Sequence, residues 1–153
     1  MSTPMKIVFL DVDGVMNFTG SKTRNSHGAY GIEPVLAERA KRILRTANAG
    51  YVLSSTWRKF PELRGEVHAA LQPDGQRLGC TDCSPDGSRA DEIQNWLYFN
   101  GPWGPVYFVI IDDWNLESNF PGHCVTTHSA IGITEADVSK ALRILERPAT
   151  WSF

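Results

Sequence analysis

The amino-acid sequence predicts a three-layer α/β fold with a central, mainly parallel sheet. Residues 6–10 and 106–111 are apolar runs rich in β-branched residues, as expected for strands buried on both faces. Segments with helical periodicity lie between these runs and a shorter strand. This order is typical of a parallel sheet that has helices on its two faces.

The first half of the chain is expected to supply two strands and two helices. The helix over residues 33–47 has Pro34 in its first turn and an apolar stripe that would face the sheet. A polar segment without periodicity precedes it and should form a loop over the strand edge. The expected elements are a strand at 6–10, a loop at 17–31, a helix at 33–47, a strand at 51–54 and a helix near 61–71.

The second half adds two strands and two helices. Residues 72–87 collect Pro, Gly, Asp and Cys, which predicts a long irregular connection. Ser88 and Thr134 are each followed three residues later by an acid, the pattern of helix N-caps. The expected elements are a helix from 88, a break at 100–105, strands at 106–111 and 123–127 separated by a loop at 115–122, and a helix from 134 to about 145.

Length and composition are those of one globular domain spanning residues 1–153. A net charge of −2 gives no overall basic surface for nucleic acid, and the apolar runs are too short to span a bilayer. No signal peptide is evident, so we expect a cytoplasmic protein without a membrane partner. Three cysteines do not form a disulfide framework; Cys80 and Cys83 have the spacing of half a zinc site, but free thiols are the default expectation.

The first strand ends in two acids, Asp11 and Asp13, followed by Gly14. If the strand continued, both side chains would point the same way, so that one Mg²⁺ could bridge them or one could attack while the other moves protons. A calcium loop needs acids where the chain has Val15 and Lys22, which argues against calcium. A solvated turn at the strand end remains the structural alternative.

These residues resemble the first motif of the haloacid dehalogenase (HAD) superfamily of phosphohydrolases, Asp-x-Asp-Gly-Val at the end of an N-terminal strand. Candidates for the three other motifs follow in the family's order. They are Ser54-Ser55 after the second strand, Arg89 at a helix start, and Asp112-Asp113 after the strand at 106–111. The resemblance implies a Rossmann-like α/β/α fold, and the short segment after the first strand leaves no room for a large cap domain.

The resemblance also implies roles for these residues. Asp11 would attack phosphorus, and Asp13 would protonate the leaving oxygen and then activate water. Mg²⁺ would be held by Asp11, the carbonyl oxygen of Asp13 and Asp112, with Asp113 in an outer position. Arg89 would neutralise the aspartyl phosphate in place of the lysine that many members use. Either Ser54 or Ser55 would donate to a phosphoryl oxygen, and a helix-capping turn is the alternative for this serine pair.

The chain looks most like the small, capless HAD domains associated with RNA repair in bacteria and phages. This likeness implies a Mg²⁺-dependent phosphomonoesterase whose substrate is a nucleotide or a nucleic-acid end. Trp57 and Arg58 would bind it by stacking a base and contacting a phosphate, unless they are a core tryptophan and a surface arginine. The alternative function is a non-catalytic binding or accessory module with the same fold.

Overall fold

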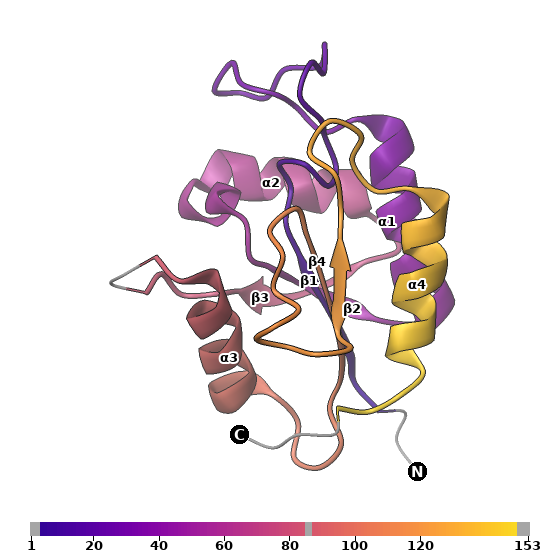
Figure 1. Ribbon diagram of the computed structural model, residues 1–153. Coiled ribbons are helices and arrows are strands. Elements are labelled where there is room, and N and C mark those ends of the chain that lie inside the picture. Colours follow the sequence, from indigo (N-terminus) through magenta and orange to yellow (C-terminus); the bar gives the residue numbers. More distant parts are fainter. Residues whose placement is uncertain (1–3, 85–86, 150–153) are drawn as a thin grey trace.

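The computed structural model describes residues 4–84 and 87–149 and contains a five-stranded parallel sheet in the strand order β3-β2-β1-β4-β5 (Figure 1). The predicted α/β class and Rossmann-like arrangement are confirmed. The elements are β1 (Lys6–Leu10), α1 (Pro34–Ala47), β2 (Gly50–Leu53), the 3-10 helix η1 (Thr56–Lys59), α2 (Pro61–Leu71), β3 (Gln76–Cys80), α3 (Arg89–Asn100), β4 (Tyr107–Asp112), β5 (Cys124–Thr126) and α4 (Glu135–Leu145).

Two hydrophobic clusters hold the layers together, one on each face of the sheet. The first joins α1, α2 and α4 to side chains such as Leu10, Tyr51 and Val109. The second joins α3 and the segment after β4 to alternate side chains of the same strands, including Phe9 and Phe108. Strand side chains alternate between faces, so the central strands are apolar on both sides and carry polar groups only at their ends.

Strand β3 corrects the expectation of a long irregular connection over residues 72–87. Residues Gln76–Cys80 pair in parallel with β2, with a register irregularity opposite Tyr51 and Val52. The sequence Gln-Arg-Leu-Gly-Cys lacks the apolar run of a buried strand, because β3 is an edge strand whose first two residues are exposed. The segment becomes a strand because it pairs with β2, which its own composition does not indicate.

The segment between β1 and α1 forms a short flap rather than a cap domain. An antiparallel bridge joins Arg24 to Tyr30, and Ser26 and His27 contact Glu66 and Glu62 of α2. This flap lies beyond the carboxyl ends of the strands, at the top of Figure 1. Within the described ranges, none of the helices combines the length and apolar character that crossing a bilayer requires.

Candidate active site

The carboxyl end of β1 turns sharply directly after Asp11. The Asp11 N–H still donates to the Ile111 carbonyl oxygen of β4, but the N–H groups of Val15 and Met16 fold back onto the Val12 carbonyl. Gly14 lies at φ +80°, and a Cβ there would sit 2.5 Å from a carboxylate oxygen of Asp113. Glycine is therefore required both for the left-handed backbone and for the close approach of the Asp113 side chain.

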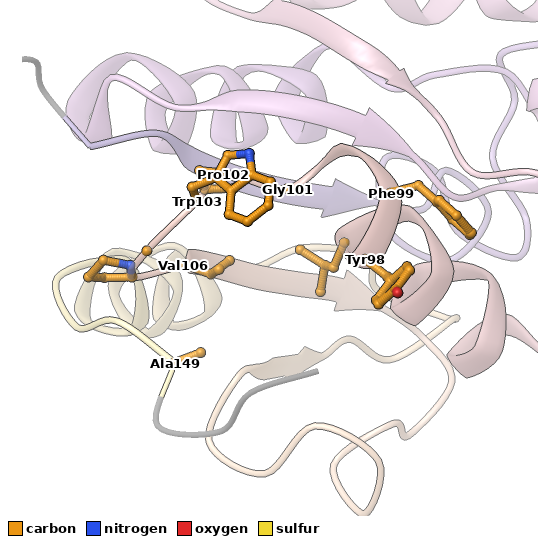
Figure 2. Close-up of a pocket in the computed structure, with 10 residues that line it drawn as sticks. Tyr98, Phe99, Gly101, Pro102, Trp103, Val106 and Ala149 are labelled. Atoms are coloured by element: carbon orange, nitrogen blue, oxygen red, sulfur yellow. The ribbon is translucent and has the colours of Figure 1, made fainter.

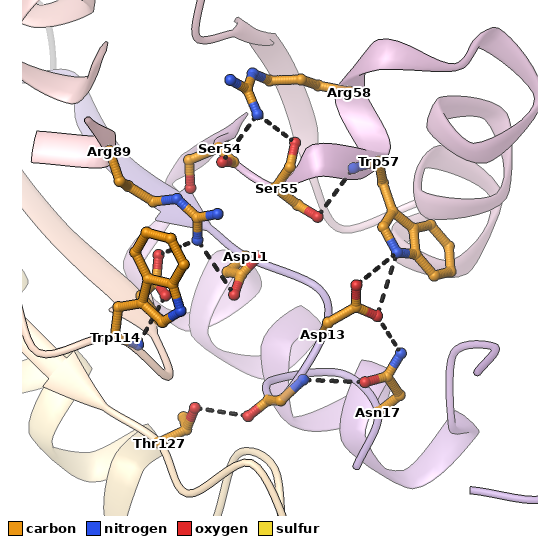
Figure 3. A network of polar contacts seen from close by, with 12 residues as sticks. Asp11, Asp13, Asn17, Ser54, Ser55, Trp57, Arg58, Arg89, Trp114 and Thr127 are labelled. Carbon is orange, nitrogen blue, oxygen red and sulfur yellow. Dashed lines mark hydrogen bonds and ion pairs between the residues drawn. The ribbon is translucent and has the colours of Figure 1, made fainter. Parts of the chain in front are cut away.

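The turn separates the two acids that alternation would have placed together. Strand β1 ends at Leu10, so strand geometry does not extend to Asp13, and its carboxylate points away from Asp11. The Asp13 carboxylate accepts from the indole N–H of Trp57, at 3.3 Å to each oxygen, and from the side-chain amide of Asn17 at 2.9 Å (Figure 3). The two carboxylates therefore lie in separate places, which corrects the expectation that one ion bridges Asp11 and Asp13.

Three other carboxylates gather where β1 and β4 end side by side. Oxygen atoms of Asp11, Asp112 and Asp113 all lie within 4.8 Å of one another. Asp11 and Asp112 are 4% and 2% exposed, and Asp113 is half-buried. Carboxylate oxygens in such a group suit a hard divalent cation such as Mg²⁺. The side chains present therefore fit the metal that the sequence predicted, with Asp113 beside Asp112 and without the Asp13 carboxylate.

Arg89, the first residue of α3, is the cation of this cluster. Ser88 caps the helix by accepting from the Asp91 N–H, as predicted, and this starts the helix where Arg89 faces the strand ends. Its guanidinium lies 2.6 Å from the Asp112 carboxylate and 3.4 Å from that of Asp11. One guanidinium among three carboxylates leaves an excess of negative charge that a divalent cation would balance.

Burial and crowding determine the electrostatics of the cluster. Burial, followed by repulsion from Asp112, raises the pKa of Asp11 well above its usual range, although Arg89 opposes this. Burial also raises the pKa of Asp113. For Arg89, burial acts to lower the pKa, but the charges of Asp11 and Asp112 outweigh it and the pKa rises. The carboxylates thus need further positive charge to ionise together, which a bound cation supplies.

The two serines at the end of β2 have different environments. The Ser55 hydroxyl caps η1 by accepting from the Trp57 N–H at 3.1 Å. The Ser54 hydroxyl is buried and has no hydrogen-bond partner, whereas its backbone N–H joins β2 to the Leu10 carbonyl of β1. A buried hydroxyl without a partner carries a cost that a phosphoryl oxygen would remove. This geometry favours Ser54 as the substrate contact and Ser55 as the structural cap.

Trp57 and Arg58 lie differently from the expected stacking and phosphate-binding pair. Trp57 is 4% exposed and packs in the hydrophobic cluster of α1, α2 and α4, so its ring has no free face for a base. Arg58 is 7% exposed and forms a 3.0 Å ion pair with the equally buried Glu92. Its guanidinium also donates to backbone carbonyls of Ser55 and Thr81. Both side chains are therefore buried against protein groups next to the site and do not present a surface to a ligand.

Sequence reasoning missed Trp114, which follows the acidic pair directly. The backbone N–H of Trp114 donates to the Asp112 carboxylate at 2.9 Å, and the ring centroid lies 4.6 Å from the guanidinium carbon of Arg89. The indole is 55% exposed. An aromatic residue next to Asp112-Asp113 was the available signal, but the sequence alone does not show that its ring turns towards Arg89.

The cluster is distinct from a pocket of about 640 Å³ at the other end of the sheet (Figure 2). That pocket is lined by Tyr98, Phe99 and Trp103 from the end of α3 and the loop before β4, without a carboxylate side chain. The cysteines likewise lie outside the described acidic metal-ligand group: all three are free, and burial raises the pKa of Cys124 to about 12. The chemistry-bearing groups are therefore those at the ends of β1, β2 and β4.

A comparison with protein families agrees with this geometry. Residues 7–138 match the model described as the HAD domain in Swiss Army Knife RNA repair proteins. No curated protein matches the chain at a significant level. A HAD domain indicates a phosphohydrolase type of function in general, and such domains typically use a metal. Because the match covers most of the sequence, including every residue of the acidic cluster and Arg89, this chain belongs to the HAD family of the Swiss Army Knife RNA repair proteins.

Proposed function

We propose that this protein is a Mg²⁺-dependent phosphomonoesterase that works through an aspartyl phosphate on Asp11. The observation that carries the proposal is the position of Arg89, which lies against both Asp11 and Asp112 at the point where a phosphoryl group would meet the nucleophile. A fixed guanidinium there would neutralise phosphoryl oxygens and hold two of them at once. The unpartnered hydroxyl of Ser54 would donate to another of these oxygens.

The reaction has two steps at the phosphorus atom. An Asp11 carboxylate oxygen forms a bond to phosphorus while the ester P–O bond breaks, and Asp13 gives its proton to the leaving oxygen. Asp13, now ionised, takes a proton from water as the water attacks phosphorus, and the bond from Asp11 to phosphorus breaks. Inorganic phosphate is released, Asp11 regains its carboxylate and Asp13 its proton.

The separate surroundings of the two acids support this division of roles. Asp11 is buried beside Arg89, as a nucleophile facing a phosphoryl group should be. Asp13 is exposed, and Trp57 and Asn17 fix its carboxylate, so it can reach a leaving group and water on the open side. Mg²⁺ would be held by Asp11 and Asp112, with Asp113 beside them and the Asp13 carbonyl oxygen as a further ligand. When bound, it would balance the charge of the carboxylates and of the phosphoryl oxygens.

We further propose that the substrate is a nucleotide or a polynucleotide end. Two observations support this class. The family model describes domains of RNA repair proteins. The segment after β1 is a short flap held on α2, so the described residues supply no domain that would enclose a small molecule.

The test is a phosphatase assay with an aryl phosphate, with Mg²⁺ and with a chelator, on the wild type and Asp11→Asn. We expect Mg²⁺-dependent turnover in the wild type and none in the variant, because an amide cannot form the acyl phosphate. Asp91→Asn, which changes an exposed acid of α3, is the matched control and should keep full activity. In Asp13→Asn, mass spectrometry should detect a phosphorylated protein, because a phenolate can leave the aryl phosphate without a proton donor whereas the attacking water still lacks its base.

Substrate class requires a second comparison, between sugar phosphates and nucleotides or oligonucleotides phosphorylated at the 5′ or 3′ end. Turnover of sugar phosphates alone would contradict the nucleic-acid class while leaving the chemistry intact. No turnover of any monoester, together with retained binding, would instead identify a non-catalytic module.

A further inference from the structure

Trp114 presents two different faces at the candidate site. One lies over the guanidinium of Arg89, with the ring centroid 4.6 Å from the guanidinium carbon (Figure 3). Because the indole is 55% exposed, a large part of its surface remains open to solvent. A partly exposed tryptophan ring beside the acidic cluster offers a flat apolar area for ligand contact.

Two contacts fix Trp114, one at its backbone and one at its ring. The Trp114 N–H donates to Asp112 at 2.9 Å, and Asp112 is in turn paired with Arg89 at 2.6 Å. Trp114 is thus linked to Asp112 through its backbone N–H and to Arg89 through its ring. A ring that is already oriented loses little conformational entropy when a ligand stacks on it.

We infer that Trp114 determines substrate specificity by stacking on the planar base of a nucleotide whose phosphate lies at Asp11 and Arg89. The inference rests on the proposed function and takes over the stacking role that the buried Trp57 does not fill. A base on the open face would give a stack of guanidinium, indole and base, in which the cation polarises the ring from behind. Because every base has a flat face, this contact favours nucleotides over sugar phosphates without selecting one base.

The competing role for Trp114 is to hold Arg89 alone. A pure positioning role would affect every phosphate ester equally, since every ester needs the guanidinium. A stacking role would affect only esters that carry a planar group. Substrates that differ in nothing but the base therefore separate the two roles.

The experiment uses short oligonucleotides with one terminal phosphate, whose terminal nucleotide either carries its base or is abasic, prepared in both the 5′ and the 3′ series. Trp114→Leu should raise the KM for the base-bearing oligonucleotide about tenfold, equivalent to about 1.4 kcal/mol, with kcat little changed. The KM for the abasic oligonucleotide should stay within about twofold. Trp114→Phe, which keeps an aromatic face, should recover most of the loss.

The matched control is Trp103→Leu, because Trp103 is fully exposed in the distant pocket at the other end of the sheet. It should leave both substrates unaffected. Equal losses on the base-bearing and abasic substrates in Trp114→Leu would overturn the inference and leave Trp114 as a positioning residue for Arg89. No loss on either substrate would overturn it as well.

Binding measurements keep this test independent of turnover. Calorimetry in Mg²⁺ would compare a nucleoside monophosphate with ribose 5-phosphate on the wild type and Trp114→Leu. If no ester is hydrolysed but the variant loses affinity for the nucleotide alone, the proposed activity fails and the stacking inference stands. If the wild type turns over esters yet binds both ligands equally, the activity stands and the inference fails.

Discussion

The indole N–H of Trp57 points at the carboxylate of Asp13, with 3.3 Å from its nitrogen to each carboxylate oxygen. A buried core residue thus orients the exposed acid to which we assign proton transfer. The ring comes from η1, directly after the cap formed by Ser55, so the end of β2 determines the geometry of a group that follows β1.

Replacing Trp57 by Phe removes this donor while keeping an aromatic ring in the cluster. We expect kcat for an aryl phosphate to fall roughly ten- to a hundredfold, because small misplacements of a catalytic group are costly, with KM changed much less. The matched control is Trp96→Phe, which also removes a buried indole but lies in the cluster on the other face of the sheet. A similar loss of kcat in both variants would point to general destabilisation, which thermal unfolding would detect.

Ser54 and Ser55 should respond oppositely to alanine. Ser54→Ala removes a buried hydroxyl that has no protein partner, so stability should be unchanged or slightly higher while kcat/KM falls. Ser55→Ala removes the cap of η1 and should cost about 1 kcal/mol of unfolding free energy. Urea denaturation and steady-state kinetics on both variants check this. Loss of catalysis in Ser55→Ala without loss of stability would reverse the two assignments.

The acidic cluster should make stability depend on pH when no divalent cation is bound. Burial raises the pKa of Asp113 above its ordinary value of 3.8, so the folded protein holds this proton more tightly than the unfolded chain. The contribution of Asp113 to stability must therefore decline as pH rises from about 4 through the raised pKa. Asp113→Asn removes this decline, so its Tm relative to the wild type should increase over that pH range in a chelator.

Mg²⁺ should reverse the order of the Tm values of Asp113→Asn and the wild type, because it stabilises the ionised cluster. It should raise the Tm of the wild type more than that of Asp113→Asn. Asp91→Asn serves as the control for charge removal at an exposed site. A lower Tm for Asp113→Asn than for the wild type at every pH in chelator would contradict this prediction. It would mean that the contacts of the Asp113 carboxylate are favourable overall.

Removing one partner of the ion pair between Arg58 and Glu92 should strongly lower the free energy of unfolding. Both side chains are buried, so Arg58→Met leaves an uncompensated carboxylate and should cost roughly 3–5 kcal/mol. The double variant Arg58→Met with Glu92→Leu should regain part of this loss. Arg45→Ala, which removes a half-exposed partner of Asp74, should cost less than about 1 kcal/mol. Equal effects in chemical denaturation would contradict the importance of burial.

The sequence predicted the parts of this protein that local chemistry determines. Apolar runs indicated β1 and β4, cap residues indicated the starts of α3 and α4, and the order of the motifs placed Asp11, Arg89 and Asp112 at one edge of the sheet. Strand β3 was missed because an edge strand with Gln, Arg and Gly carries no apolar signal, and only its pairing with β2 makes it a strand.

The remaining differences depend on partners that are distant in the sequence. Whether Trp57 is a stacking platform or a core residue depends on α1, α2 and α4, and whether Arg58 is free depends on Glu92, which lies in a later helix. The direction of Asp13 depends on where β1 stops pairing. Such facts follow from tertiary packing, which no local pattern reports.

Strand β1 lies at the centre of the sheet, between β2 and β4, and this order governs when the site can exist during synthesis. A nascent chain that has left the ribosome only as far as α3 carries the nucleophile and the guanidinium but lacks Asp112 and Asp113. The site needs contacts between distant parts of the chain, and these form after the local helices. Until β4 emerges and pairs with β1, the growing polypeptide carries Asp11 without Asp112 and Asp113, so the cation site can form only after the chain has been made beyond Asp113.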